Sequence, residues 1–276
     1  MYGFLIKKSF FDDWDNLLTV FIVNLLAVFA ALGLLFTGTK LFTVFGENSE
    51  SSWPLVIVAV FLLITVIVLC IICFAFGELA AKIANFDGVS LGSFFKAIPG
   101  VLKDASLYGL LLFVMGFVSF YCFDFYFLQM QSLWGFAIGM LLFWIVVVLV
   151  LSLQWFIPLR SMLHNDFKKC FKKCLLIFFD NTGFSILVFI HTLIMIPLSI
   201  FLLGFFPGFA GILINKANAL RLRLYKYDYL EAHPERNNKK QRKDIPWDEL
   251  IYEDRETFGH RTLKSLFQPW KMDNNG

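Results

Sequence analysis

The sequence predicts an all-α polytopic membrane protein with six transmembrane helices arranged as three hairpins. Hydrophobic residues make up 58% of the 276 positions and charged residues 16%, against about 45–50% and about 25% in soluble domains. The apolar residues also gather in runs long enough to cross a bilayer. A soluble fold of this length cannot bury so much apolar surface, so the soluble, disordered, coiled-coil and disulfide-scaffold classes are excluded.

Four uncharged apolar runs predict the first four spans. They are Leu17–Phe36, Pro54–Phe76, Ser106–Phe123 and Leu133–Ile157. Each has, or comes close to, the roughly 20 residues that a helix needs to cross the hydrocarbon layer. Helices are expected rather than barrel strands, because alternation in ten-residue segments is absent.

The last apolar run predicts two further helices. Thr182–Ile214 has 33 residues without a charge, too many for one span and too few for two. Turn-forming residues lie within it, namely Gly204, Pro207, Gly208 and Gly211. We therefore expect a fifth helix over 183–203 and a marginal sixth helix from about 207 toward 225.

The basic residues favour six spans over five. With six spans and the N-terminus inside, every Lys and Arg of the 24 except Lys40 falls on the inner side. Five spans would place the basic C-terminal part outside, against the positive-inside rule. We therefore expect a bacterial inner (cytoplasmic) membrane protein with both termini in the cytoplasm.

Three parts are expected along the chain. Residues 1–16 form an amphipathic inner-face segment, 17–231 the six-helix membrane domain, and 232–276 a basic, amphipathic cytoplasmic tail. Within the tail, helix-start signals begin at Asp244 and Gly259 closes the helix. An apolar stripe then follows, formed by Leu263, Leu266, Phe267 and Trp270. The stripe fits the protein's own inner face, the bilayer surface or a partner equally well.

A weak three-fold pattern supports three hairpins. A basic amphipathic segment precedes each odd-numbered span and leads to an aspartate. We predict these aspartates to be helix N-caps, because a carboxylate accepts the free amide hydrogens at a helix start. They are Asp15, Asp104 and Asp180. Internal duplication would explain the pattern. So would the requirement that each helix entering the membrane from the cytoplasm has basic residues and an N-cap.

Few polar side chains within the spans are candidates for function. His191 could titrate, bind a metal or carry protons. It could equally hydrogen-bond to a neighbouring helix, since no other metal-ligating residue lies three or four positions away. Asp124, late in the third helix among aromatic residues, is expected to anchor at the outer interface. Glu78 and Lys82 are spaced as an ion pair one helical turn apart.

Two inner-loop stretches carry a resemblance to a known family. Residues 79–84 (LAAKIA) and 89–96 (VSLGSFFK) combine a helix end of small residues and a base, a short turn and a Phe-Phe-Lys segment, and FIPLR at 156–160 ends the fourth helix. With the run 171–187, these stretches resemble the YesL-like family of bacterial membrane proteins across residues 16–225. The chain departs from that pattern in a longer first outer loop and in its tail. The family is functionally uncharacterised, and its association with carbohydrate-uptake transporter genes implies context rather than chemistry.

The function expected from these observations is not catalytic. The sequence has no nucleophile elbow, phosphate loop or paired metal motif, and its cysteines are expected to pack in the interior. We expect a non-enzymatic inner-membrane accessory protein without a cofactor. Its partners would be the lipid bilayer and membrane transporter subunits, contacted through inner loops and tail, and not nucleic acid. The alternative is a small secondary transporter or channel with His191 in the path.

Overall fold

A computed structural model of the chain describes all residues except 47–52, 236–243, 260 and 262–276. The described residues form eleven α-helices and one π-helical segment, with no strand among them. The predicted all-α class is therefore confirmed. The apolar stripe at 263–270 and the basic run at 236–243 lie outside the described residues.

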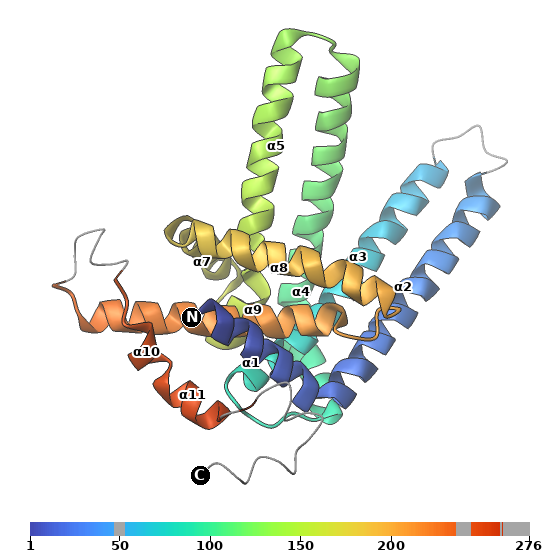
Figure 1. The fold of residues 1–276 in the computed structure, drawn as a ribbon. Coiled ribbons are helices and arrows are strands. Elements are labelled where there is room, and N and C mark those ends of the chain that lie inside the picture. Colours follow the sequence, from blue (N-terminus) through green and yellow to red (C-terminus); the bar gives the residue numbers. More distant parts are fainter. Residues whose placement is uncertain (47–52, 236–243, 260, 262–276) are drawn as a thin grey trace.

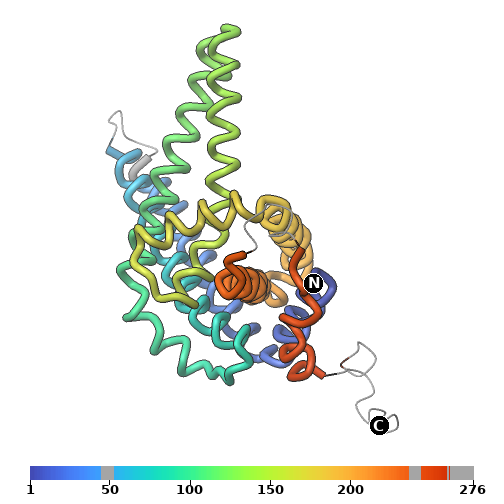
Figure 2. Tube along the Cα trace, turned by 90° about the vertical axis from the view of Figure 1, so that its left-hand side faces the viewer, coloured from blue at the N-terminus to red at the C-terminus, as the bar shows by residue number. Residues whose placement is uncertain are grey.

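Three pairs of consecutive helices form the frame of the fold (Figure 1). The pairs are α2 (Leu17–Gly46) with α3 (Trp53–Ala84), α4 (Leu91–Phe123) and the π-helical η1 (Asp124–Gln129) with α5 (Leu133–Leu153), and α8 (Thr182–Phe201) with α9 (Gly208–Ala232). The pairs diverge from one another. Figure 2 shows α4 and α5 upright where α9 is seen end-on, so these two pairs point in different directions.

Five shorter helices complete the chain. They are α1 (Tyr2–Asp15), α6 (Phe156–Leu163), α7 (Phe167–Asp180), α10 (Trp247–Leu250) and α11 (Tyr252–Phe258). α1 packs across α9, while α6 and α7 lead from the second pair to the third. Gly259 ends α11 in a left-handed conformation with φ of 68°, as the sequence predicts for the close of that helix.

Five helical stretches are long and apolar enough to cross a membrane. They are Leu17–Val44, Trp53–Ala84, Leu91–Gln129, Leu133–Leu163 and Thr182–Phe201. They support the predicted multi-pass membrane class. The predicted sixth span corresponds to α9, which is not one of the five. Basic residues recur along its length and make it too polar by composition, namely Lys216, Arg221, Arg223 and Lys226.

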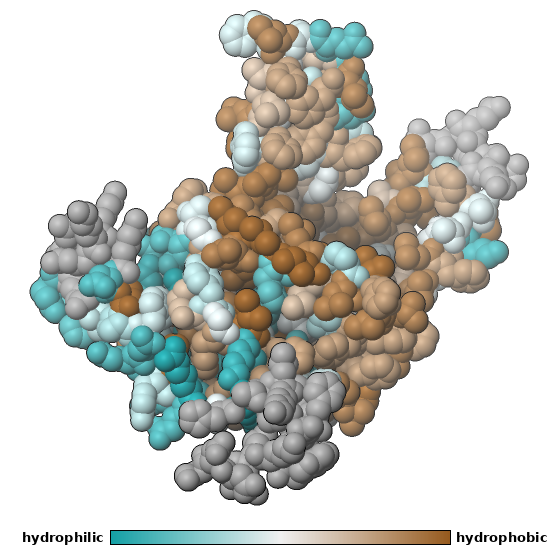
Figure 3. Space-filling model, in the orientation of Figure 1, coloured by the Kyte–Doolittle hydropathy of each residue, from teal (hydrophilic) through white to brown (hydrophobic). Residues whose placement is uncertain are grey.

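The core lies where the end of α3, the end of α5 with α6, and α9 meet. Phe74, Trp155 and Ile214 come from these three places and are each 0% exposed. Farther out, the second pair exposes large apolar side chains such as Leu133 and Trp134. Such exposure is expected of side chains that face lipid. Figure 3 shows the same division, with apolar surface over the helix pairs and hydrophilic surface gathered near the C-terminal half of α9.

The predicted N-caps Asp15 and Asp180 lie instead at the ends of short helices. α1 and α7 each have 14 residues and each end in one of these aspartates. An asparagine follows each of them before the next helix begins. Asn181 occupies the N-cap position of α8, and the Asn16 carbonyl accepts the first hydrogen bond of α2, from Val20. The N-cap prediction is wrong for both aspartates because each lies one residue too early.

Asp104 is not an N-cap either. It lies within α4, whose N-cap is Ser90. The amphipathic segment and the span form one continuous helix here, so no helix start exists at Asp104. The three-fold pattern therefore appears as a helix break at an Asp-Asn step at two of the three places and as an unbroken helix at the third.

Gly77 of α3 lies where α3 and α6 approach each other closely. A Cβ at this position would lie 2.5 Å from Ile157 Cγ2 and 3.0 Å from Ser161 Oγ. We expect Gly77→Ala to destabilise the protein by about 1–3 kcal/mol, because the two helices must separate. The measurement is thermal unfolding in detergent, followed by circular dichroism.

The matched control is Gly100→Ala in α4, where an added Cβ meets nothing within 4 Å. That variant should match or slightly exceed the wild type, since alanine favours a helix over glycine by about 1 kcal/mol. Equal behaviour of the two variants would contradict the close packing of α3 on α6.

Candidate functional site

α9 carries polar side chains into the interior of the protein. Asn215, Asn218, Arg223 and Lys226 are all buried, and α9 packs against α1, α3, α6 and α8. Buried polar groups need hydrogen-bond partners, because their desolvation is otherwise uncompensated. The partners of α9 therefore show which elements are arranged around it.

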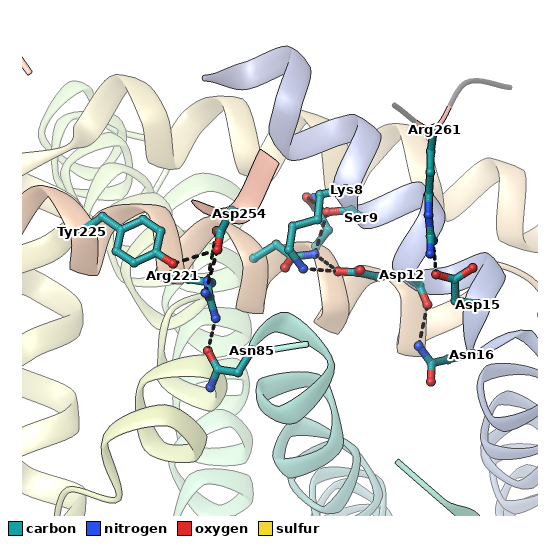
Figure 4. Close-up of polar contacts among 12 residues, drawn as sticks. Lys8, Ser9, Asp12, Asp15, Asn16, Asn85, Arg221, Tyr225, Asp254 and Arg261 are labelled. Atoms are coloured by element: carbon teal, nitrogen blue, oxygen red, sulfur yellow. Dashed lines mark hydrogen bonds and ion pairs between the residues drawn. The ribbon is translucent and has the colours of Figure 1, made fainter. Parts of the chain in front are cut away.

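α1 meets α9 through a buried hydrogen-bond network, part of which Figure 4 shows. Lys8 Nζ lies 2.7 Å from Asp12 Oδ2, one turn away on α1. Asn218 Nδ2 donates to the same carboxylate oxygen over 2.7 Å and to Ser9 Oγ over 3.2 Å. Ser9 Oγ in turn donates to Asn215 Oδ1 over 3.2 Å. Burial lowers the pKa of Lys8 and raises the pKa of Asp12.

Asn215 extends this network to His191 on α8. Its Nδ2 lies 2.6 Å from His191 Nδ1. Because Asn215 Oδ1 accepts from Ser9, Nδ2 is the donor, which makes His191 Nδ1 an acceptor and leaves the ring proton on Nε2. The interhelical hydrogen-bond interpretation of His191 is confirmed. Among the described residues, no group of three or more His, Cys, Asp or Glu side chains could hold a metal ion.

A cavity of about 620 Å³ lies between α1, α8 and α9. Its apolar wall includes Ile6, Phe10, Phe11, Met195, Leu198 and Phe206. Its polar lining includes Ser9, Asp13, His191 and Asn215. Binding sites for small molecules typically have this volume, about 300–1,000 Å³, and this mixture of apolar walls with a few polar groups.

Asp13 is the acidic group of the cavity. Its side chain is buried, and Oδ1 has no hydrogen-bond partner in the described structure. Gly211 of α9 lies against the other oxygen, since a Cβ there would be 2.8 Å from Asp13 Oδ2. Burial, and then the neighbouring Asp12 carboxylate, raise the pKa of Asp13 well above its ordinary value. Sequence reasoning placed Asp13 in an amphipathic segment and missed this role.

The tail docks on α9 (Figure 4) and, through the Phe258 ring, on Phe4 and Phe11 of α1. Arg221 Nη2 lies 2.8 Å from Asp254 Oδ1, which also accepts from the Tyr225 hydroxyl over 3.0 Å. Arg221 also donates to the Asn85 side chain after α3. Asp254 and Ile251 of the tail are buried. The described part of the tail therefore lies on the protein itself, while the apolar stripe for which three docking surfaces were predicted lies outside the described residues.

α9 runs back along α8, as contacts at both ends of the pair show. At one end, Lys226 Nζ lies 2.6 Å from Asp180 Oδ2 and 2.8 Å from Asn181 Oδ1. At the other end, Gly208 N donates to Ser199 Oγ over 3.1 Å. The two helices are therefore antiparallel, with the end of α9 beside the start of α8.

Asn24 of α2 holds the turn between α8 and α9. Its Nδ2 donates to the Phe205 and Pro207 carbonyls over 3.0 and 2.8 Å, and its Oδ1 accepts from Ala210 N over 3.0 Å. This lone polar amide of the first apolar run therefore has a structural partner for each of its polar atoms.

Arg160 of α6 joins its own helix to α3 and α4. It pairs with Glu78 of α3 and with Asp104 of α4, the latter over 2.9 Å, and donates to the Gly100 carbonyl over 2.9 Å. The predicted pairing of Glu78 with Lys82 is corrected, because the long Arg160 side chain reaches Glu78 from α6. Lys82 instead lines a separate pocket of about 420 Å³.

The remaining candidates lie away from the cavity. Asp124 begins η1 at the turn between α4 and α5 and accepts from Gln129 Nε2 over 2.6 Å, a position compatible with interfacial anchoring. Asp15 pairs with Arg261 beyond α11. Cys170 and Cys174 are 0% exposed, which agrees with the packing interpretation of these thiols.

Asp13 makes stability depend on pH in a defined direction. Its folded-state pKa is raised above 3.8, so the unfolded state loses its proton first as the pH rises. The stability that Asp13 contributes is present at low pH and is lost toward its folded-state pKa. We expect the wild type to lose stability relative to Asp13→Asn as the pH rises from about 4 toward the raised folded-state pKa of Asp13, by up to about 1.4 kcal/mol per pH unit.

Chemical unfolding in detergent across this pH range measures the difference. The comparison reports on Asp13 together with its charge coupling to the neighbouring Asp12. The control is Asp87→Asn, which removes an exposed carboxyl after α3 and should follow the wild type. A pH-independent difference between wild type and Asp13→Asn would refute the raised pKa.

Comparisons with protein-family models, with curated proteins and with solved structures give no match for this chain. The resemblance to the YesL-like family therefore stays a prediction from the inner-loop motifs. What this protein does has to be argued from its own geometry.

Proposed function

We propose that this protein is a non-enzymatic accessory protein of a membrane assembly in the bacterial inner membrane. In this proposal it crosses the membrane six times, as three hairpins with both termini in the cytoplasm. The antiparallel course of α9 along α8 supports that topology, because a helix that returns beside a span ends on the side where the span began. The basic residues near the end of α9 and in the tail agree with a cytoplasmic location.

The observation that carries the proposal is the divergence of the helix pairs from one polar core (Figures 1 and 2). An apolar groove of about 570 Å³ opens between α2 and α3 on one side and α8 and α9 on the other. Small and branched residues line it, among them Ala27, Ala31, Ile196 and Ile200. Transmembrane helices pack closely where small residues let their backbones approach, so the groove suits a helix of another membrane subunit.

The partner we propose is a subunit of a carbohydrate-uptake transporter. This choice rests on the resemblance to the YesL-like family and on its association with such genes. The helix pairs would pack against the partner within the bilayer, and the polar face formed by α1, α11 and the C-terminal part of α9 would lie toward the cytoplasm.

Co-purification after mild detergent extraction tests the proposal. We expect transporter subunits to be recovered with the tagged wild type. Ala27→Phe and Ala31→Phe, which fill the groove, should reduce recovery at least about tenfold without unfolding the protein. The control is Val118→Phe on α4, which is exposed outside this groove. A monomer without a partner would refute the proposal, and so would equal recovery for groove and control variants.

A second candidate, a small transporter or channel, is favoured by one observation. His191 and Asn215 both line the cavity between α1, α8 and α9, where a histidine could relay protons. Proton flux into dye-loaded proteoliposomes under an imposed potential measures this activity.

For that candidate we expect protein-dependent proton flux that His191→Ala abolishes. His233→Ala, which lies beyond the end of α9, should leave the flux unchanged. The proton path would be refuted by the absence of protein-dependent flux or by equal flux in the two variants.

A further inference from the structure

The cavity between α1, α8 and α9 has two facing walls built on helical spacing. Ile6, Phe10 and Asp13 recur along one face of α1, and His191, Met195 and Leu198 recur along one face of α8. α9 closes the cavity between them, where Gly211 and Pro207 lie. α1 and α8 lie on either side of α9 in Figure 1. Among the described residues that line the cavity, Asp13 is the only acidic one, and most of the others are apolar.

The cations of this part of the polar core are engaged with other groups. Lys8 pairs with Asp12, and Arg221 pairs with Asp254. Lys7 also lines the cavity, but its Nζ lies over the Phe258 ring, 5.3 Å from the centroid. The described structure therefore places no ion-pair partner on Asp13, and its Oδ1 accepts no hydrogen bond.

A buried carboxyl group without a partner is unfavourable for the fold by itself. A ligand that brings a positive charge and N–H donors would supply what Asp13 lacks. An anionic ligand would bring a second negative charge beside Asp13 and supply no N–H donor, and a neutral alcohol would supply a donor without the charge. The apolar walls require that the ligand also carry an apolar body, for which about 620 Å³ gives room.

We propose that this cavity binds an amphipathic primary amine, with the ammonium group on the Asp13 carboxylate and the apolar body between the walls of α1 and α8. The inference goes beyond the accessory role and does not depend on a partner protein. The ammonium can come from a free amphiphilic amine or from an aminophospholipid headgroup, since both present the same group.

Gly211 is part of the same site. Its missing side chain leaves the Asp13 carboxyl room beside α9, because a Cβ would lie 2.6 Å from Pro207 Cβ and 2.8 Å from Asp13 Oδ2. Gly211→Ala therefore displaces the carboxyl without removing it. This variant therefore perturbs the site while the Asp13 carboxyl group is kept.

The test compares 4-phenylbutylamine with 4-phenylbutanol, which differ in the charged group alone. Binding is measured by calorimetry to the full chain in nanodiscs of phosphatidylcholine and phosphatidylglycerol. We expect the amine to bind the wild type at least about tenfold more tightly than the alcohol. Asp13→Asn should remove that preference, Gly211→Ala should reduce it, and Asp87→Asn should retain it.

A measurement on the wild type alone keeps the proposal testable if a variant does not fold. Burial raises the pKa of Asp13 in the empty cavity, and a bound ammonium favours the carboxylate, so amine binding should release protons at pH values between the unperturbed and the raised pKa. Calorimetry in two buffers of different ionisation enthalpy detects that release, and the alcohol should release none. Equal affinities for amine and alcohol would overturn the proposal, as would amine binding without proton release.

The source of the ammonium is decided by lipid composition. If phosphatidylethanolamine in the nanodiscs weakens binding of 4-phenylbutylamine, the headgroup occupies the site. If it leaves binding unchanged, a free amine is the ligand. Both results retain the site, whereas absence of amine binding in nanodiscs without aminophospholipid would overturn it.

Discussion

The burial of polar side chains on α9 is the constraint on which the rest of the structure depends. A helix with Lys216, Arg221, Arg223 and Lys226 could not face hydrocarbon without a large desolvation penalty. It is instead enclosed by α1, α3, α6 and α8. Several of these helices also supply a polar side chain that pairs with α9.

The acidic partners come from three parts of the chain that are far apart in sequence. Asp12 of α1 accepts from Asn218, Asp180 of α7 pairs with Lys226, and Asp254 of α11 pairs with Arg221. The N-terminal helix and the tail are therefore parts of the polar core rather than free appendages. The hydrophilic surface gathers in the same region, near the C-terminal half of α9 (Figure 3).

The features that the sequence predicts well are those set by local composition. The five apolar spans follow from hydropathy, and the close of α11 at Gly259 follows from glycine's tolerance of positive φ. Pairings between distant residues were not predictable in the same way. Glu78 was expected to pair one turn away with Lys82, yet Arg160 reaches it from α6, and no local pattern encodes that contact. Asp13 could have been found from its recurrence with Ile6 and Phe10 on one face of α1.

Asp13 differs from the other acidic groups of this core in one physical respect. Asp12, Asp180 and Asp254 each stabilise the fold by meeting a cation or an amide that would otherwise be buried alone. Asp13 meets neither, and its Oδ1 is left without a partner in the described structure. A fold that needed this position only for packing would be more stable with an apolar side chain there, since a buried carboxyl carries a desolvation penalty even when protonated. The group is therefore better explained by something that enters the cavity than by the packing of α1 on α9.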